Sequence, residues 1–149
     1  FLDDLLAARF YRGSVIIINL NDSNLMGERR ERVLRGASQV DIVMGNRDEF
    51  KALFEVGEIV DLAEDPRLVD KICVITDGPE PVHLVHNSIC EKVIVPRVGA
   101  EEIVSTLGAG DAFAAGFIAA FLKSEPLYMC ALFGAKQSTK IIKKLDGRP

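Results

Sequence analysis

The sequence predicts an α/β fold of three layers, with a mainly parallel sheet and helices on both faces. Three short apolar runs rich in β-branched residues lack polar alternation, which is typical of buried parallel strands. Segments with helical spacing separate these runs. Because strand and helix alternate through most of the chain, a sheet covered on both sides is favoured. The strand-like runs are residues 15–20, 41–44 and 71–76.

The remaining elements follow from periodicity and turn residues. A two-residue turn at Asn87 and Ser88, flanked by apolar runs at 82–85 and 89–95, predicts a hairpin at one edge of the sheet. Four arginines, at positions 29, 30, 32 and 35, predict a charged, solvated helix surface. Helices are expected over 1–12, 28–38, 46–56, partly over 59–69, and over 109–123 and 127–144.

Composition limits the class of protein. The chain has 149 residues, 48% of them hydrophobic, and no apolar run approaches 18 residues, so we expect a folded domain without a transmembrane helix. Its net charge of −4 argues against non-specific nucleic-acid binding. Three widely spaced cysteines in apolar surroundings predict free thiols, and therefore a reducing, cytoplasmic compartment. The start at Phe1, without Met, is typical of the middle of a longer protein.

The most informative stretch is Ser-Thr-Leu-Gly-Ala-Gly-Asp-Ala-Phe at residues 105–113. Gly108 and Gly110 allow a tight turn that exposes backbone N–H groups at the start of a helix, where an anion such as phosphate is favoured. Asp111 could accept a proton from a hydroxyl that attacks that phosphate. An ordinary glycine-punctuated loop, with an acid in the first helical turn, is an equally good interpretation of Gly-Ala-Gly-Asp alone.

The longer string resembles the signature of the ribokinase-like (PfkB) family of carbohydrate and nucleoside kinases, usually D-T-x-G-A-G-D. The resemblance implies that Asp111 is the catalytic base and that Gly108, Ala109 and Gly110 form the anion hole. Thr106 falls in the same motif, which places it with the nucleotide-binding residues. The first aspartate of the motif is replaced by Ser105, so a carboxylate that orders the loop or a nearby cation is missing.

A second motif precedes the first by about 60 residues. Asn46-Arg-Asp-Glu49 follows a predicted strand and opens a predicted helix, so a capping box is the simplest interpretation. The string also matches the N-x-x-E motif of the family. By resemblance Glu49 helps to hold Mg2+, through water, and Asn46 lies near the nucleotide phosphates. Two carboxylates, Glu49 and Asp111, on one phosphate would need a divalent cation between them. Both interpretations can hold together.

A third, weaker match follows the strand-like run at 71–76. The family often has T-x-G-x-x-G here, and Thr76 and Gly78 fit as nucleotide-binding residues, while Pro81 replaces the second glycine. An ordinary Asp-Gly-Pro turn explains the same residues equally well. In the last predicted helix, Ala135 and Ser138 are small enough to line a base pocket.

The resemblance covers nearly the whole chain but corresponds only to the C-terminal half of such a kinase. Residues 1–149 are therefore expected to form a single α/β domain, the nucleotide-binding C-terminal half of a larger fold whose N-terminal half and lid are missing. The string at 101–113 is similar to the adenosine-kinase branch, so a nucleoside acceptor is favoured over a sugar. ATP and Mg2+ are the implied ligands, and whether a monovalent cation also binds stays open.

Three hypotheses remain at this point. The chain is the nucleotide-binding half of a small-molecule kinase, and by itself a poor catalyst. Alternatively, it is a non-catalytic relative that binds nucleotides or serves as an interaction module, as Ser105 and Pro81 would suggest. The third possibility is a structural α/β domain with coincidental motifs. Neither nucleic acid nor membrane is an expected partner, and the sequence leaves the oligomeric state open.

Overall fold

The computed structural model describes residues 14–21, 24 and 27–143. The helix expected over residues 1–12 lies outside them. The described chain divides into two compact units. Unit 1 holds the described residues up to Ile75 together with His83–Glu91, and unit 2 holds Thr76–Val82 and the described residues from Lys92 onward.

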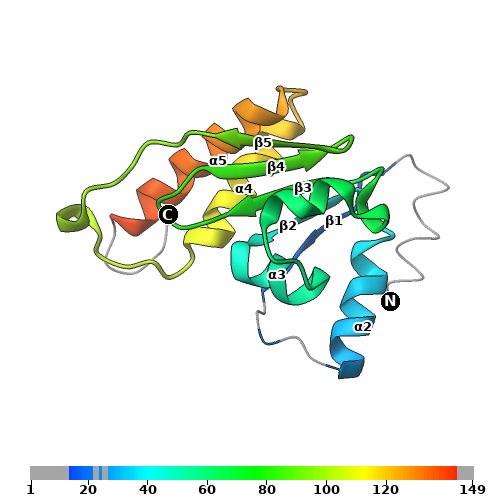
Figure 1. Cartoon of the computed structure of the whole chain (residues 1–149). Helices are drawn as coiled ribbons and strands as arrows, with labels where there is room; N and C mark the ends of the chain where they lie inside the picture. The colour runs from blue at the N-terminus through cyan, green and yellow to red at the C-terminus, as the bar shows by residue number, and fades with distance from the viewer. Residues whose placement is uncertain (1–13, 22–23, 25–26, 144–149) are drawn as a thin grey trace. The chain divides into compact units, whose positions relative to one another are not determined.

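Five strands form one sheet in the order β1-β2-β3-β4-β5 (Figure 1). The sheet is mixed, because β1 and β2 are parallel while β3 and β4 are antiparallel. This confirms the α/β class and the hairpin at the edge of the sheet. The strands are β1 (Ile17–Asn19), β2 (Ile42–Asn46), β3 (Ile72–Thr76), β4 (Val82–His86) and β5 (Ile89–Val93).

The first strand departs most from the sequence prediction. Only Ile17–Asn19 of the run at 15–20 forms the strand, its residues are half-buried, and Val15 is 51% exposed. The reason is its place in the sheet, since β1 ends the order of the described strands and β2 is its one neighbour among them. Its register with β2 pairs Ile17 with Ile42. The prediction of a fully buried strand here was wrong.

The turn between β4 and β5 is the one the sequence predicts. Asn87 and Ser88 both have positive φ, 50° and 59°. Two consecutive residues with positive φ define a type I′ turn, whose twist matches that of the flanking strands. Asparagine tolerates this conformation better than most residues, which is why the pattern could be read from the sequence.

Unit 1 has one hydrophobic core beside the sheet. Helices α2 (Gly27–Ala37) and α3 (Arg47–Phe54) lie next to each other (Figure 1). After α3 the chain forms two 3-10 helices, η1 (Ile59–Glu64) and η2 (Pro66–Leu68). The core joins these elements to β2, β3 and β4 through side chains that are nearly inaccessible to solvent. They include Ala37, Val40, Val43, Phe50, Leu53, Phe54, Leu62, Leu68, Cys73, Ile75 and Val85.

Unit 2 is built around a helical hairpin. A short 3-10 turn, η3 (Ala100–Glu102), precedes α4 (Ala109–Phe121), and α5 (Leu127–Ile142) packs beside α4 (Figure 1). The two glycines at the helix crossing explain how closely the helices approach. A Cβ on Gly116 would lie 2.8 Å from the Phe133 carbonyl oxygen, and one on Gly134 would lie 2.8 Å from the Phe113 carbonyl oxygen. The expected helices over 109–123 and 127–144 are thus confirmed to within two residues.

The crossing yields a stability prediction. Gly116→Ala is expected to destabilise the fold by about 1–3 kcal/mol, because the added methyl group meets backbone atoms that cannot rotate away. Gly110→Ala is the matched control, since it makes the same change in the same helix where a Cβ would meet no atom within 4 Å. Thermal unfolding of both variants checks this. Equal melting temperatures for the two would contradict the crossing as described.

Candidate active site

The loop at residues 105–111 ends in the N-terminus of α4. Gly108 is the N-cap residue and has φ of 75°, a left-handed conformation that suits glycine. The Ala109 N–H donates to the Thr106 carbonyl at 3.2 Å, and the Ala112 N–H donates to the Gly108 carbonyl at 3.0 Å. Within the described chain, the N–H groups of Gly110 and Asp111 donate to no acceptor. The start of α4 therefore presents two unpaired donors.

Space for a ligand lies beside these donors. A Cβ built on Gly110 would meet nothing within 4 Å, and no side chain caps the helix. Unpaired N–H groups at a helix start carry partial positive charge and bind anions. The geometry therefore suits a phosphate group at the N–H groups of Gly110 and Asp111; of the predicted set Gly108, Ala109 and Gly110, Ala109 has its N–H paired with the Thr106 carbonyl. The helix begins at Ala109, so two of these three residues form its first turn.

Ser105 occupies the position of the missing aspartate. Its Oγ accepts a hydrogen bond from the Leu107 N–H at 3.2 Å. A serine hydroxyl that bonds the backbone two residues on fixes a local turn, as an aspartate carboxylate would do. The substitution thus keeps a side-chain acceptor for ordering the loop, although it removes the negative charge. Thr106 is exposed, and its backbone carbonyl holds the first turn of α4.

Asp111 is exposed and lines a hollow of about 880 Å³ between α4 and α5. Gly108 lies at the same end of the hollow, whose far end reaches Lys123 and Glu125. The carboxylate is therefore accessible from solvent, next to the unpaired donors. The rest of the lining comes from Ala112, Ala115, Gly116, Ala119, Ala120, Phe133, Gln137, Lys140 and Ile141.

Sequence reasoning missed this hollow. The lining residues on α5 include Phe133, which is 40% exposed, and do not include Ala135 or Ser138. Ala135 is only 8% exposed, so it packs in the interior. The exposed alanines 115 and 119 on α4, four residues apart, were the available signal.

Asn46 and Glu49 form a complete capping box at the start of α3. The Asn46 Oδ1 accepts from the Glu49 N–H at 2.9 Å, and the Glu49 Oε2 accepts from the Asn46 N–H at 2.7 Å. Glu49 is only 9% exposed. Gly45 makes room for its carboxylate, because a Cβ there would lie 2.8 Å from Oε2. The capping interpretation is therefore confirmed, and it fixes the orientation of the Glu49 carboxylate.

The third motif forms a turn after β3. Thr76 is the last residue of the strand, and Gly78 has φ of 55°. The Glu80 N–H donates to the Asp77 carbonyl at 2.9 Å, which closes the turn. Gly78 is exposed, and a Cβ built on it would meet no atom within 4 Å. Glycine is needed here for backbone conformation, which the ordinary-turn interpretation already explains.

Two of the cysteines are unsuited to nucleophilic chemistry. Burial raises the pKa of the Cys73 thiol to about 12, and it also raises that of Cys130. The thiolate is the reactive form, so both groups stay inert at neutral pH. None of the three cysteines forms a disulfide. Among the described residues no group of three or more His, Cys, Asp or Glu side chains could hold a metal ion by itself.

Comparison with known proteins decides the family. The sequence pattern of the pfkB family carbohydrate kinases matches residues 5–148. The chain belongs to this family. It is 32% identical to a cytidine kinase from Thermococcus kodakarensis over 121 residues, which is 78% of this chain and 42% of that protein. It is also 27% identical to adenosine kinase 2 from Arabidopsis thaliana, over 70% of this chain and 34% of the relative.

Solved structures of an adenosine kinase and of a probable sugar kinase share the fold. Adenosine kinase from Schistosoma mansoni, in complex with 2-fluoroadenosine, superposes with a TM-score of 0.85 at 24% identity, covering 99% of this chain and 47% of that one. A probable sugar kinase from Rhizobium etli gives the same TM-score, over 99% of this chain and 45% of its own. The chain thus spans less than half the length of these relatives. No helix in the described part of the chain is long and apolar enough to cross a membrane.

Proposed function

We propose that the chain is the nucleotide-binding half of an ATP-dependent kinase. This kinase phosphorylates a hydroxyl group of an adenosine-like nucleoside or of a sugar. The observation that carries the proposal is the start of α4, where two unpaired N–H groups border open space beside the exposed Asp111 carboxylate. An anion-binding helix start next to a carboxylate base suits phosphoryl transfer to an alcohol.

Four residues of the loop have tasks in this reaction. The N–H groups of Gly110 and Asp111 bind the oxygens of the transferred phosphoryl group and stabilise the charge that develops there. Asp111 accepts the proton of the acceptor hydroxyl as that oxygen attacks phosphorus and the bond to ADP breaks. Ser105 and Thr106 hold the loop through the hydrogen bonds to Leu107 and Ala109.

Magnesium fits the donor chemistry of the chain. Mg2+ in kinases is held by one or two carboxylates together with phosphate oxygens and water, so a preformed group of three protein ligands is not required. When bound, the ion offsets the charge of the nucleotide phosphates. Glu49 would hold it, through water, with Oε2 already oriented by Asn46. We assign Asn46, Thr76, Gly78 and Thr106 to nucleotide binding.

The acceptor is assigned from the relatives. Proteins similar to this chain are named cytidine kinase and adenosine kinase, and one structural neighbour is a probable sugar kinase. We therefore propose a small-molecule acceptor of the nucleoside or sugar class, and we favour a nucleoside over a sugar. Three cysteines without a disulfide agree with a reducing compartment, and we propose the cytoplasm.

Glu49→Gln is expected to raise the Mg2+ concentration needed for half-maximal rate, with the defect partly relieved by added Mg2+. Glutamine keeps an oxygen that can accept from the Asn46 N–H, so the capping box and the melting temperature should survive. The measurement is initial rate against Mg2+ for the full-length kinase. Asp48→Asn is the matched control, because it removes an exposed charge from the same helical turn. An equal Mg2+ requirement in both variants would count against the role of Glu49.

Acceptor-dependent ADP formation tests the proposal as a whole. A kinase forms ADP from ATP–Mg2+ only when a nucleoside or sugar is supplied. The alternative, a non-catalytic nucleotide-binding relative, would show a rise in melting temperature with ATP–Mg2+ but no acceptor-dependent ADP. The hydrogen bond from the Leu107 N–H to the Ser105 Oγ removes one reason to prefer the non-catalytic alternative, because Ser105 still supplies a side-chain acceptor to the loop.

A further inference from the structure

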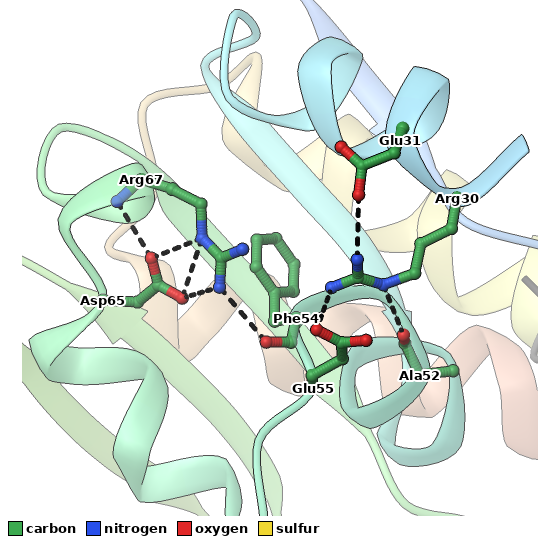
Figure 2. Close-up of polar contacts among 7 residues, drawn as sticks. All are labelled: Arg30, Glu31, Ala52, Phe54, Glu55, Asp65 and Arg67. Atoms are coloured by element: carbon green, nitrogen blue, oxygen red, sulfur yellow. Dashed lines mark hydrogen bonds and ion pairs between the residues drawn. The ribbon is translucent and has the colours of Figure 1, made fainter. Parts of the chain in front are cut away.

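The C-terminus of α3 is held by two arginine side chains from different elements (Figure 2). Arg30, on α2, donates from Nε to the Ala52 carbonyl at 3.2 Å. Arg67, in η2, donates from Nη2 to the Phe54 carbonyl at 3.1 Å. The last carbonyls of a helix have no partner within the helix itself. Two of them are satisfied here by cations, which also suit the negative end of the helix dipole.

Each arginine is fixed in turn by carboxylates. Arg67 forms a two-point contact with Asp65, with Nε 2.8 Å from Oδ1 and Nη2 2.5 Å from Oδ2, and its guanidinium lies 5.3 Å from the centre of the Phe54 ring. The hydrogen bond from Arg67 lowers the pKa of the Asp65 carboxyl, so the pair stays ionised at neutral pH. Arg30, only 12% exposed, pairs with Glu55 at 2.9 Å and Glu31 at 3.1 Å (Figure 2).

These contacts matter because α3 is short. It has eight residues, about 12 Å of helix, and isolated helices of this length do not persist in water. Its geometry is set by the capping box at one end, the buried face of Phe50, Leu53 and Phe54, and the arginine contacts at the other end. Glu49 is separated from the Phe54 carbonyl by little more than one turn. We therefore expect a change in how the C-terminus is held to shift the carboxylate at the N-terminus.

We propose that the Asp65–Arg67 pair is a positioning element for Glu49, and through it for the Mg2+–nucleotide complex. The inference rests on the proposed function, because it takes Glu49 as the residue that holds the ion. Arg67 does not touch the nucleotide; it acts by fixing the end of the helix that carries Glu49. Arg30 holds the same end from α2 and supports the same geometry.

The test compares Arg67→Ala and Arg67→Lys in the full-length kinase. Arg67→Ala is expected to raise the half-saturating Mg2+ concentration by up to about tenfold, because loss of a direct hydrogen-bond partner of a metal ligand costs about tenfold or more and Arg67 acts on Glu49 only through the helix. The KM for the acceptor should stay unchanged. Arg67→Lys should be intermediate, because an ammonium can pair with Asp65 but cannot keep the planar two-point contact and the bond to Phe54 together. Amide hydrogen exchange at Asn46 and Glu49 should be faster in Arg67→Ala.

Two controls separate positioning from general loss of stability. Arg97→Ala removes an exposed arginine that pairs with Glu80, and Val40→Ala opens a gap in the unit 1 core. Neither should change the Mg2+ requirement. If Arg67→Ala lowers the melting temperature with no change in Mg2+ requirement, while Glu49→Gln does change it, the pair is only structural and the inference fails. If Glu49→Gln leaves the Mg2+ requirement unchanged, the assignment of Glu49 itself fails, and this inference falls with it.

Discussion

Asp111→Asn is expected to reduce turnover of the full-length kinase by roughly 10²- to 10⁴-fold, the range that a positioned general base contributes. Asparagine has nearly the same shape, and the backbone N–H of residue 111 remains available to the phosphoryl oxygens. It cannot, however, accept the proton of the acceptor hydroxyl. ATP–Mg2+ binding should therefore be largely unchanged. Initial rates and equilibrium ATP binding, measured on the same preparation, check both halves of this prediction.

Glu125→Gln is the control for Asp111→Asn. Glu125 lines the far end of the hollow that Asp111 also lines, so its replacement likewise removes a carboxylate from the lining of the hollow. Turnover should stay near the wild-type value. Parallel losses of turnover and ATP binding in Asp111→Asn would indicate that Asp111 supports the fold of the loop and has no separate role as a base.

Gly110→Ala is expected to leave the protein folded and yet to reduce turnover by about 10²-fold or more, comparable with the loss of one anion-hole donor. A Cβ on Gly110 meets no protein atom within 4 Å, and we expect the methyl group to occupy the open space that we assign to the phosphoryl group. Alanine also suits a helix better than glycine, so the melting temperature should be unchanged or higher. Melting temperature and initial rate are measured together.

Gly57→Ala is the control for Gly110→Ala, because its added Cβ would make only an ordinary contact, 3.9 Å from an Asp61 oxygen. Both its stability and its turnover should resemble those of the wild type. Full activity in Gly110→Ala would show that the space beside this residue is not the phosphoryl site.

Local features were the ones that the sequence could predict. The capping box of Asn46 and Glu49 and the turn at Asn87 and Ser88 each depend on residues within a few positions of one another. The start of α4 at the Gly-Ala-Gly loop is of the same kind. In each case the side chain or the glycine meets a need of the backbone close by, so the pattern survives whatever the rest of the chain does.

Features that depend on distant parts of the chain could not be predicted. Arg30 was expected on a solvated helix surface, but it is only 12% exposed because it reaches Ala52, 22 residues away. β1 was expected to be buried, and its place at the end of the order of the described strands follows only from the pairing of all five. The helix crossing at Gly116 and the hollow that Asp111 lines likewise form only because α4 and α5 pack against each other.

Direct transfer of the γ-phosphoryl group tests the central claim most sharply. Full-length protein is incubated with ATP labelled at the γ-phosphate, Mg2+ and adenosine, cytidine or a sugar in parallel, with Asp111→Asn beside the wild type. We expect the wild type to form a labelled monophosphate of one of these acceptors. The variant should form the same product at a rate lower by roughly 10²-fold or more. Stoichiometric binding of ATP–Mg2+ with no label passing to any acceptor would contradict it.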